Sequence, residues 1–163
     1  MTEFYPWFVF LHLIGLVVFA FGHGVSMFAA FRARATPEPR AVRGALEASS
    51  MALGPMYIGL LLLAIGGIGA ATIGGLWGQP WVWGSVVILI IVIVAMYAIA
   101  TPYYRQVRTA VGAPAGNQPA GESTVTQEEL VRLLDSRRPE TLMAVGTIGL
   151  VALVWLMVLK PTF

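Results

Sequence analysis

Cysteine is absent from the sequence, which excludes disulfide bonds, thiolate metal ligands and catalytic thiols. Charged residues are scarce, because Asp, Glu, Lys and Arg together make up only 11% of the 163 residues. None of them lies within the four longest apolar segments, so a carboxylate proton relay or ion site at membrane depth is not expected. The sequence also has no recognisable nucleophile–base arrangement or phosphate-binding loop. It therefore assigns no catalytic residue and leaves open whether the protein is an enzyme.

Apolar residues make up 58% of the chain and gather in four segments of about the length that crosses a bilayer. The segments are 7–31, 51–77, 82–104 and 141–159. Only Glu3 carries a charge before the first segment, so we interpret this segment as a spanning helix rather than a cleaved signal peptide. The sequence predicts an all-α integral membrane four-helix bundle, with a single domain over residues 1–163 embedded in the lipid bilayer.

Basic residues are distributed unevenly around these segments. Nine arginines lie in the two long loops, 32–50 and 105–140, whereas Lys160 lies on the opposite side. By the positive-inside rule both loops are cytoplasmic, and the N-terminus and C-terminus are both outside a bacterial inner membrane. The five tryptophans fall near the predicted outer ends, where aromatic belts form. The net charge of +2 reflects this bias and does not indicate a nucleic-acid partner.

The loops carry their own local signals. Residues 40–47 have helical composition and either follow the membrane surface or extend the second span. Residues 111–123 are rich in Gly, Ala and Pro, which is typical of a flexible linker. Thr126 and Glu129 match a capping box, and the leucines that follow predict a short amphipathic helix. This helix either lies on the inner leaflet, caps the bundle or forms a docking site for a partner. The loop acids are expected to be ordinary solvated charges, and the short turn at 78–80 predicts that spans two and three are antiparallel neighbours.

The second span contains two rows of small residues at intervals of four. The rows are Gly66/Ala70/Gly74 and Gly67/Ala71/Gly75. In lipid such rows allow helix backbones to approach closely, so the simplest interpretation is packing within the bundle. Room for a flat cofactor and contact in a homo-oligomer are the alternatives. Pro102, near the end of the third span, is expected to terminate or kink that helix.

His12 and His23 are the only histidines, and both lie in the first apolar segment. At about 100° and 1.5 Å per residue, their spacing of eleven turns the helix about 20° past three full turns and advances about 16 Å. Both imidazoles therefore point the same way at two depths. An ionisable group at membrane depth is a candidate functional residue.

Three roles are open for these histidines. Each imidazole can simply hydrogen-bond to a neighbouring helix. Each can bind the iron of a b-type haem, for which Gly22 and Gly24 beside His23 would leave space. A copper site is the third role, because His23 and Met27 lie at i and i+4, and imidazole and thioether are ligands that suit Cu(I). Met51 and Met56 are expected near the same level.

Three short segments resemble those of small bacterial four-span membrane proteins. They are residues 10–15, 22–26 and 155–161, with the sequences FLHLIG, GHGVS and WLMVLKP. The chain most resembles uncharacterised families of such proteins, and more loosely the CopD-like copper-resistance domains and the HemJ-type protoporphyrinogen oxidases. The HemJ-type resemblance implies that His12 is a haem ligand. The intramembrane lysine of that group has no counterpart between Val82 and Tyr104, so the resemblance implies haem binding rather than oxidase activity.

The leading hypothesis is a membrane protein with a redox or haem-linked role that binds b-type haem through His12. His23 is then a second ligand or a second site. One helix cannot supply both faces of a porphyrin, so a trans ligand is needed: water, a methionine or the histidine of a partner chain. The alternatives are an accessory or assembly subunit of a larger membrane complex, and a copper-handling protein with His12, His23 and Met27 as candidate ligands.

Overall fold

The computed structural model describes residues 2–115, 119–123 and 125–161, and these are overwhelmingly helical. The elements are η1 (Thr2–Phe4), α1 (Tyr5–Ala35), α2 (Pro39–Ile73), η2 (Leu76–Gly78), α3 (Pro80–Ala110), α4 (Gln127–Leu134) and α5 (Arg138–Leu159). Four helical stretches are long and apolar enough to cross a membrane. The prediction of an all-α membrane bundle is therefore confirmed.

Each of the four long helices has a proline in its first turn: Pro6, Pro39, Pro80 and Pro139. Proline suits this position because its fixed φ is helical and its missing N–H would be unpaired there in any case. The turn between α2 and α3 has Gly75 at φ 63°, a left-handed conformation that favours glycine. These local signals set where the spans begin and where the chain reverses.

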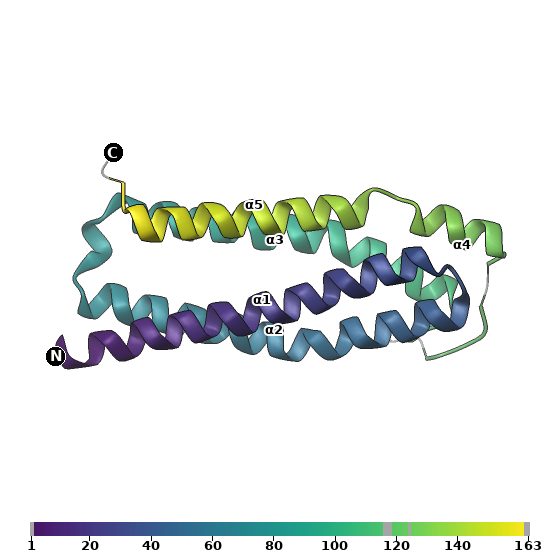
Figure 1. Ribbon diagram of the computed structural model, residues 1–163, viewed down its shortest axis with the longest axis horizontal. Coiled ribbons are helices and arrows are strands. Elements are labelled where there is room, and N and C mark those ends of the chain that lie inside the picture. Colours follow the sequence, from purple (N-terminus) through teal and green to yellow (C-terminus); the bar gives the residue numbers. More distant parts are fainter. Residues whose placement is uncertain (1, 116–118, 124, 162–163) are drawn as a thin grey trace.

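The long helices form two antiparallel pairs, α1 with α2 and α3 with α5 (Figure 1). Both termini lie at one end of the molecule, and α4 lies at the other end together with the link between α1 and α2 (Figure 1). The α2 and α3 helices are antiparallel, but they contact each other much less than each contacts its own partner. The prediction that these two helices are antiparallel is therefore right, whereas the prediction that they are close neighbours is not.

Glycines explain why α1 and α2 pack so closely. A Cβ atom added to Gly66 would lie 2.7 Å from the Cα of His12, and one added to Gly15 would lie 2.8 Å from the carbonyl oxygen of Gly59. Gly59 faces Phe19 in the same way. These are contacts between backbones, which only glycine permits. The interpretation that the small residues of the second span pack against a neighbouring helix is supported for Gly66. Gly75 instead lies in the turn after α2. We call the close contact of α1 with α2 at Gly15, Gly59 and Gly66 the seam.

The end that carries α4, which we call the basic end, has a hydrophobic core of its own. Val42 and Leu46 of α2 pack there with Val107 of α3 and with Leu130 and Leu134 of α4, all at most 3% exposed. The predicted capping box is present, since the Thr126 hydroxyl accepts from the Glu129 backbone and the Thr126 backbone donates to the Glu129 carboxylate. These capping bonds lower the pKa of Glu129. The amphipathic helix is therefore packed against the bundle.

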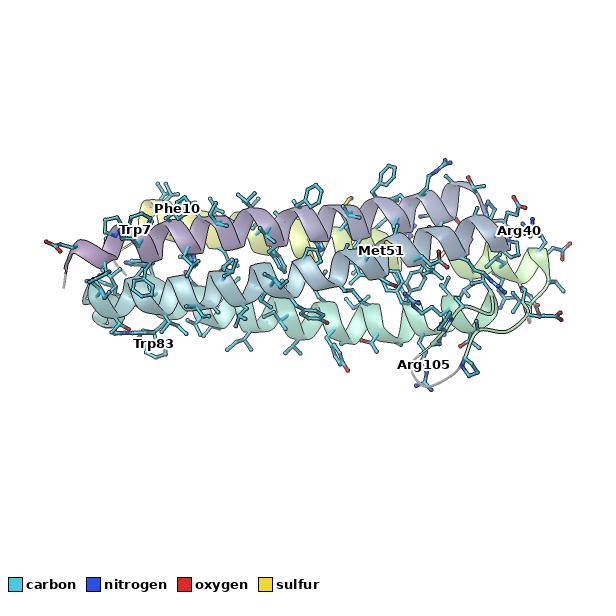
Figure 2. The ribbon with its side chains drawn as sticks, turned by 90° about the horizontal axis from the view of Figure 1, so that it is seen from below. Trp7, Phe10, Arg40, Met51, Trp83 and Arg105 are labelled. Atoms are coloured by element: carbon cyan, nitrogen blue, oxygen red, sulfur yellow. The ribbon has the colours of Figure 1, made fainter. Side chains whose placement is uncertain are left out.

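The two ends of the molecule differ in chemistry (Figure 2). Trp7 and Trp83 lie at the end with the termini, whereas Arg40 and Arg105 lie at the basic end. Between the ends, large apolar side chains such as Val87, Ile90 and Val94 of α3 are more than half exposed. Such surfaces are stable only in lipid, so these side chains of α3 face the bilayer.

The helices continue beyond the apolar segments. Residues 40–47 belong to α2, which begins at Pro39, so the alternative that they extend the second span is the one that holds. The α3 helix continues through Pro102 to Ala110, so Pro102 does not terminate it. Within 111–123, residues 116–118 are outside the described residues, but Val111 is fully buried and its carbonyl accepts a hydrogen bond from Arg43. That part of the predicted linker is therefore packed against the bundle.

Two of the loop acids pair with an arginine. The Arg34 guanidinium of α1 forms ion pairs with Asp135, at 2.7 Å, and with Glu140. These contacts tie the first helix to the end of α4 and to the first turn of α5. The side chain of Asp135 is 73% exposed and that of Glu140 is 43% exposed, in agreement with the prediction of solvated charges, but the sequence alone does not show that Arg34 lies opposite them.

Candidate functional site

His12 lies where three of the long helices meet. Its ring, half-buried on α1, donates a hydrogen bond from Nδ1 to the carbonyl oxygen of Leu63 on α2, at 2.7 Å. Its other nitrogen, Nε2, lies 3.4 Å from the Sδ atom of Met157 on α5. A Cβ atom on Gly67 would lie 3.0 Å from Nδ1, so the absence of a side chain there makes room for the ring.

The contact with Leu63 shows which nitrogen of the His12 ring carries a proton. A carbonyl oxygen only accepts hydrogen bonds, so Nδ1 is the protonated nitrogen, and Nε2 is the one that offers a lone pair when the imidazole is neutral. The Met157 sulfur that faces Nε2 is an acceptor and has no proton to donate. A nitrogen and a sulfur that can both bind a metal therefore lie opposite each other across the boundary between the two helix pairs. Metal-binding histidines commonly have this arrangement, with the second nitrogen fixed by a backbone carbonyl.

His23 also points toward α5, at a deeper level. A Cβ atom on Gly146 would lie 2.6 Å from its Nε2, so only glycine fits opposite the imidazole. The ring stacks on Phe19, one turn earlier on α1, with ring centroids 6.2 Å apart. No hydrogen bond to the His23 ring is formed within the described part of the chain.

The two histidines thus occupy equivalent positions along one boundary. Met157 and Gly146 are eleven residues apart on α5, as His12 and His23 are on α1, and the two helices are antiparallel. The prediction that both imidazoles share one face of the first helix agrees with the structure. That face is turned toward α5, the helix that α1 contacts far less than α2.

The methionines of the predicted copper site differ in how far they are buried. Met27 is buried one turn beyond His23, whereas the His23 ring leans back onto Phe19. Met51 is 77% exposed at the lipid-facing surface, and Met56 packs beside Gly22. Among residues 2–115, 119–123 and 125–161 there is no cluster of three or more His, Asp or Glu side chains that could hold a metal ion.

Met157 is the site residue that sequence reasoning missed. It lies in the closing segment 155–161, but nothing in that segment distinguishes it from the other methionines. The missing information is the register between α1 and α5, which pairs residues 12 and 157 near one end and residues 23 and 146 deeper in the bundle.

Comparison with known proteins gives one match. A family model described as "Predicted integral membrane protein (DUF2269)" matches residues 7–161. No curated protein and no solved structure matches the chain. The match supports the resemblance to uncharacterised membrane families, whereas the looser resemblance to CopD-like and HemJ-type proteins stays a prediction.

Proposed function

The chain belongs to this family of predicted integral membrane proteins, and we propose that it binds one b-type haem between its two helix pairs. His12 and Met157 would hold the haem, and the proposed role is redox or haem-linked. The observation that carries the proposal is the orientation of His12, whose Nε2 faces a thioether sulfur from another helix while Nδ1 donates to a backbone carbonyl. Helix bundles commonly build cofactor sites from side chains on facing helices.

The separation of the two candidate ligand atoms bears on the fit. His12 Nε2 and Met157 Sδ lie 3.4 Å apart, less than the sum of about 2.0 Å and about 2.3 Å for metal bonds to nitrogen and sulfur. To hold a haem iron between these atoms, α1 and α5 would have to move apart, and further still to admit the porphyrin ring. Direct contact between α1 and α5 is sparse compared with that between α1 and α2.

His23 cannot be the second ligand of the same iron. It lies about 16 Å from His12 along the helix, several times the separation of trans ligand atoms on one metal. The position opposite His23 on α5 is Gly146, which offers no ligand atom. We therefore assign His23 to a second, subordinate site or to packing, and the primary site to His12.

Copper is the second candidate, and one observation favours it. At 3.4 Å, the His12 and Met157 ligand atoms subtend about 105° at an ion with the same bond lengths, which is near tetrahedral. Imidazole and thioether suit Cu(I). A bare ion, however, needs further ligands. A porphyrin supplies four nitrogens of its own, so two protein ligands are sufficient for haem, and for this reason haem is the leading proposal.

A haem held by both His12 and Met157 would supply electron transfer rather than oxygen activation. His12 and Met157 would hold the group near the end of the bundle that carries the termini, within reach of a redox partner at that surface. An accessory role in a larger membrane complex remains the alternative if no cofactor is bound.

The test is the absorption spectrum of the purified protein after expression with added haem precursor. We expect a Soret band that shifts on reduction, with close to one iron per chain. A sample that contains neither iron nor a Soret band, even after reconstitution with hemin, would contradict haem binding. Retention of Cu(I) by the same sample, lost in Met157→Leu, would support the copper alternative.

We also propose that the basic end faces the cytoplasm of a bacterial inner membrane, because nine arginines lie in the two loops at this end. The natural chain has no cysteine, so single introduced cysteines report orientation cleanly. A membrane-impermeant maleimide is expected to label Glu128→Cys in inverted vesicles only, and Glu3→Cys in right-side-out vesicles only. The opposite pattern would reverse the orientation.

A further inference from the structure

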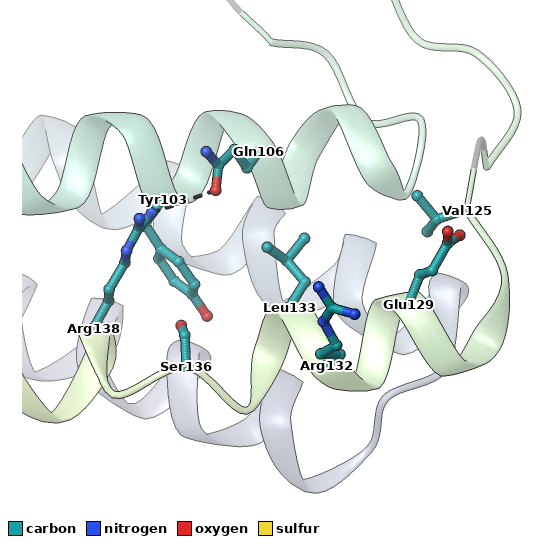
Figure 3. Close-up of a pocket in the computed structure, with 8 residues that line it drawn as sticks. All are labelled: Tyr103, Gln106, Val125, Glu129, Arg132, Leu133, Ser136 and Arg138. Atoms are coloured by element: carbon teal, nitrogen blue, oxygen red, sulfur yellow. Dashed lines mark hydrogen bonds between the residues drawn. The ribbon is translucent and has the colours of Figure 1, made fainter.

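A cavity of about 460 Å³ lies at the basic end, remote from His12 (Figure 3). Tyr103 and Gln106 line it from α3, and Glu129 and Arg132 line it from α4. Ser136 and Arg138 complete it, at the turn between α4 and α5 and at the first residue of α5. The haem proposal makes no use of this cavity.

The cavity has an excess of positive charge. Arg132 and Arg138 supply two guanidinium groups, and the one carboxylate, Glu129, already accepts the capping hydrogen bond from the Thr126 backbone at 2.9 Å. Arg138 donates to the neutral side chain of Gln106 at 3.3 Å. Within the described part of the chain, the ion pairs are those of Arg34, and neither cavity arginine takes part in one.

Uncharged hydroxyl groups lie beside these cations. In Figure 3 the hydroxyl groups of Tyr103 and Ser136 point toward each other below Gln106. The Ser136 Oγ atom is buried, and the Tyr103 hydroxyl is the group that faces it. Each hydroxyl group carries a proton, so a ligand with acceptor oxygens that reached them would accept hydrogen bonds from both.

We propose that this cavity binds a phosphate group. Two guanidinium groups with adjacent hydroxyl donors match the oxygens of a phosphate, which arginine binds through paired charge-assisted hydrogen bonds. The cavity lies at the end of the spans, at the level of an interface, and basic pockets between spanning helices bind anionic lipid head groups there. The phosphate of an anionic phospholipid and a water-soluble phosphate share this chemistry.

The experiment uses the full chain, purified in detergent and stripped of lipid. Native mass spectrometry measures binding of phosphatidylglycerol and of zwitterionic phosphatidylcholine, and thermal unfolding measures stabilisation by inorganic phosphate. The test variant is Arg132→Gln/Arg138→Gln. The matched control is Arg40→Gln/Arg105→Gln, which removes the same charge from two exposed arginines that do not line the cavity.

We expect phosphatidylglycerol to bind the unmodified chain and the control more tightly than phosphatidylcholine. Binding by the test variant should be at least about tenfold weaker, because hydrogen bonds to charged groups are lost. If the test variant loses stabilisation by inorganic phosphate but binds phosphatidylglycerol as tightly as the unmodified chain does, the ligand is a soluble phosphate. Equal losses in test and control variants, or no loss in either arm, would overturn the proposal.

Discussion

The His12→Ala variant is expected to bind haem more than about 100-fold more weakly than the unmodified chain. Removing a group that only orients a metal ligand typically costs about 10–100-fold in affinity, and the loss of the ligand itself should cost more. The His12 imidazole donates to the Leu63 carbonyl and directs Nε2 at Met157. The alanine of the variant supplies no nitrogen ligand in its place. The measurement is a hemin titration followed at the Soret band.

His23→Ala is the matched control for this prediction. It removes the other imidazole from the same face of α1, about 16 Å away along the helix. We expect it to retain haem at near-normal affinity. Loss of haem in His23→Ala together with retention in His12→Ala would move the primary site to the deeper position.

Met157→Leu should behave differently from His12→Ala. It keeps the apolar volume of the side chain and removes only the sulfur, so haem stays bound through His12. The reduction potential should fall, because a thioether ligand raises it. Met157→His should restore a six-coordinate spectrum with a low potential. An unchanged potential in Met157→Leu would show that the sulfur does not bind the iron.

Gly66→Ala, in the seam, is expected to cause a large loss of stability. The new Cβ atom would lie 2.7 Å from the Cα of His12 and 2.8 Å from the carbonyl oxygen of Phe8. Both are backbone atoms, which cannot move aside as a side chain can. The helices must then separate, and overpacking of this kind costs about 1–3 kcal/mol or more. Thermal unfolding in detergent measures the effect.

Gly44→Ala provides the control on the same helix. A Cβ atom at Gly44 would have no neighbour within 4 Å, so the higher helix propensity of alanine is the main effect. This effect favours the folded helix by up to about 1 kcal/mol. We expect Gly44→Ala to unfold at or above the temperature of the unmodified chain and Gly66→Ala well below it. Equal unfolding temperatures would contradict the close packing of α1 on α2.

The spans were predictable because each is a long uncharged segment, and the capping box was predictable because it is local. The ends of the helices were not. A hydropathy pattern stops at the first charge, such as Arg40, whereas a helix stops where its backbone hydrogen bonds stop, and α2 therefore includes residues 39–50. Charged residues continue a helix outside the membrane without any apolar signal.

The candidate site was half predictable. The spacing of His12 and His23 shows that they share a face, because helix geometry depends only on sequence separation. The identity of their neighbours depends on how the two helix pairs meet, which no local pattern encodes. Nothing in the sequence marks Met157 as the residue opposite His12, or Gly146 as the residue opposite His23.

The central claim is that His12 and Met157 bind one iron, and X-ray absorption at the iron edge of the haem-loaded protein tests it most directly. We predict one sulfur at about 2.3 Å from the iron in the unmodified chain and its loss in Met157→Leu. An iron surrounded only by nitrogen or oxygen in the unmodified chain would contradict the claim.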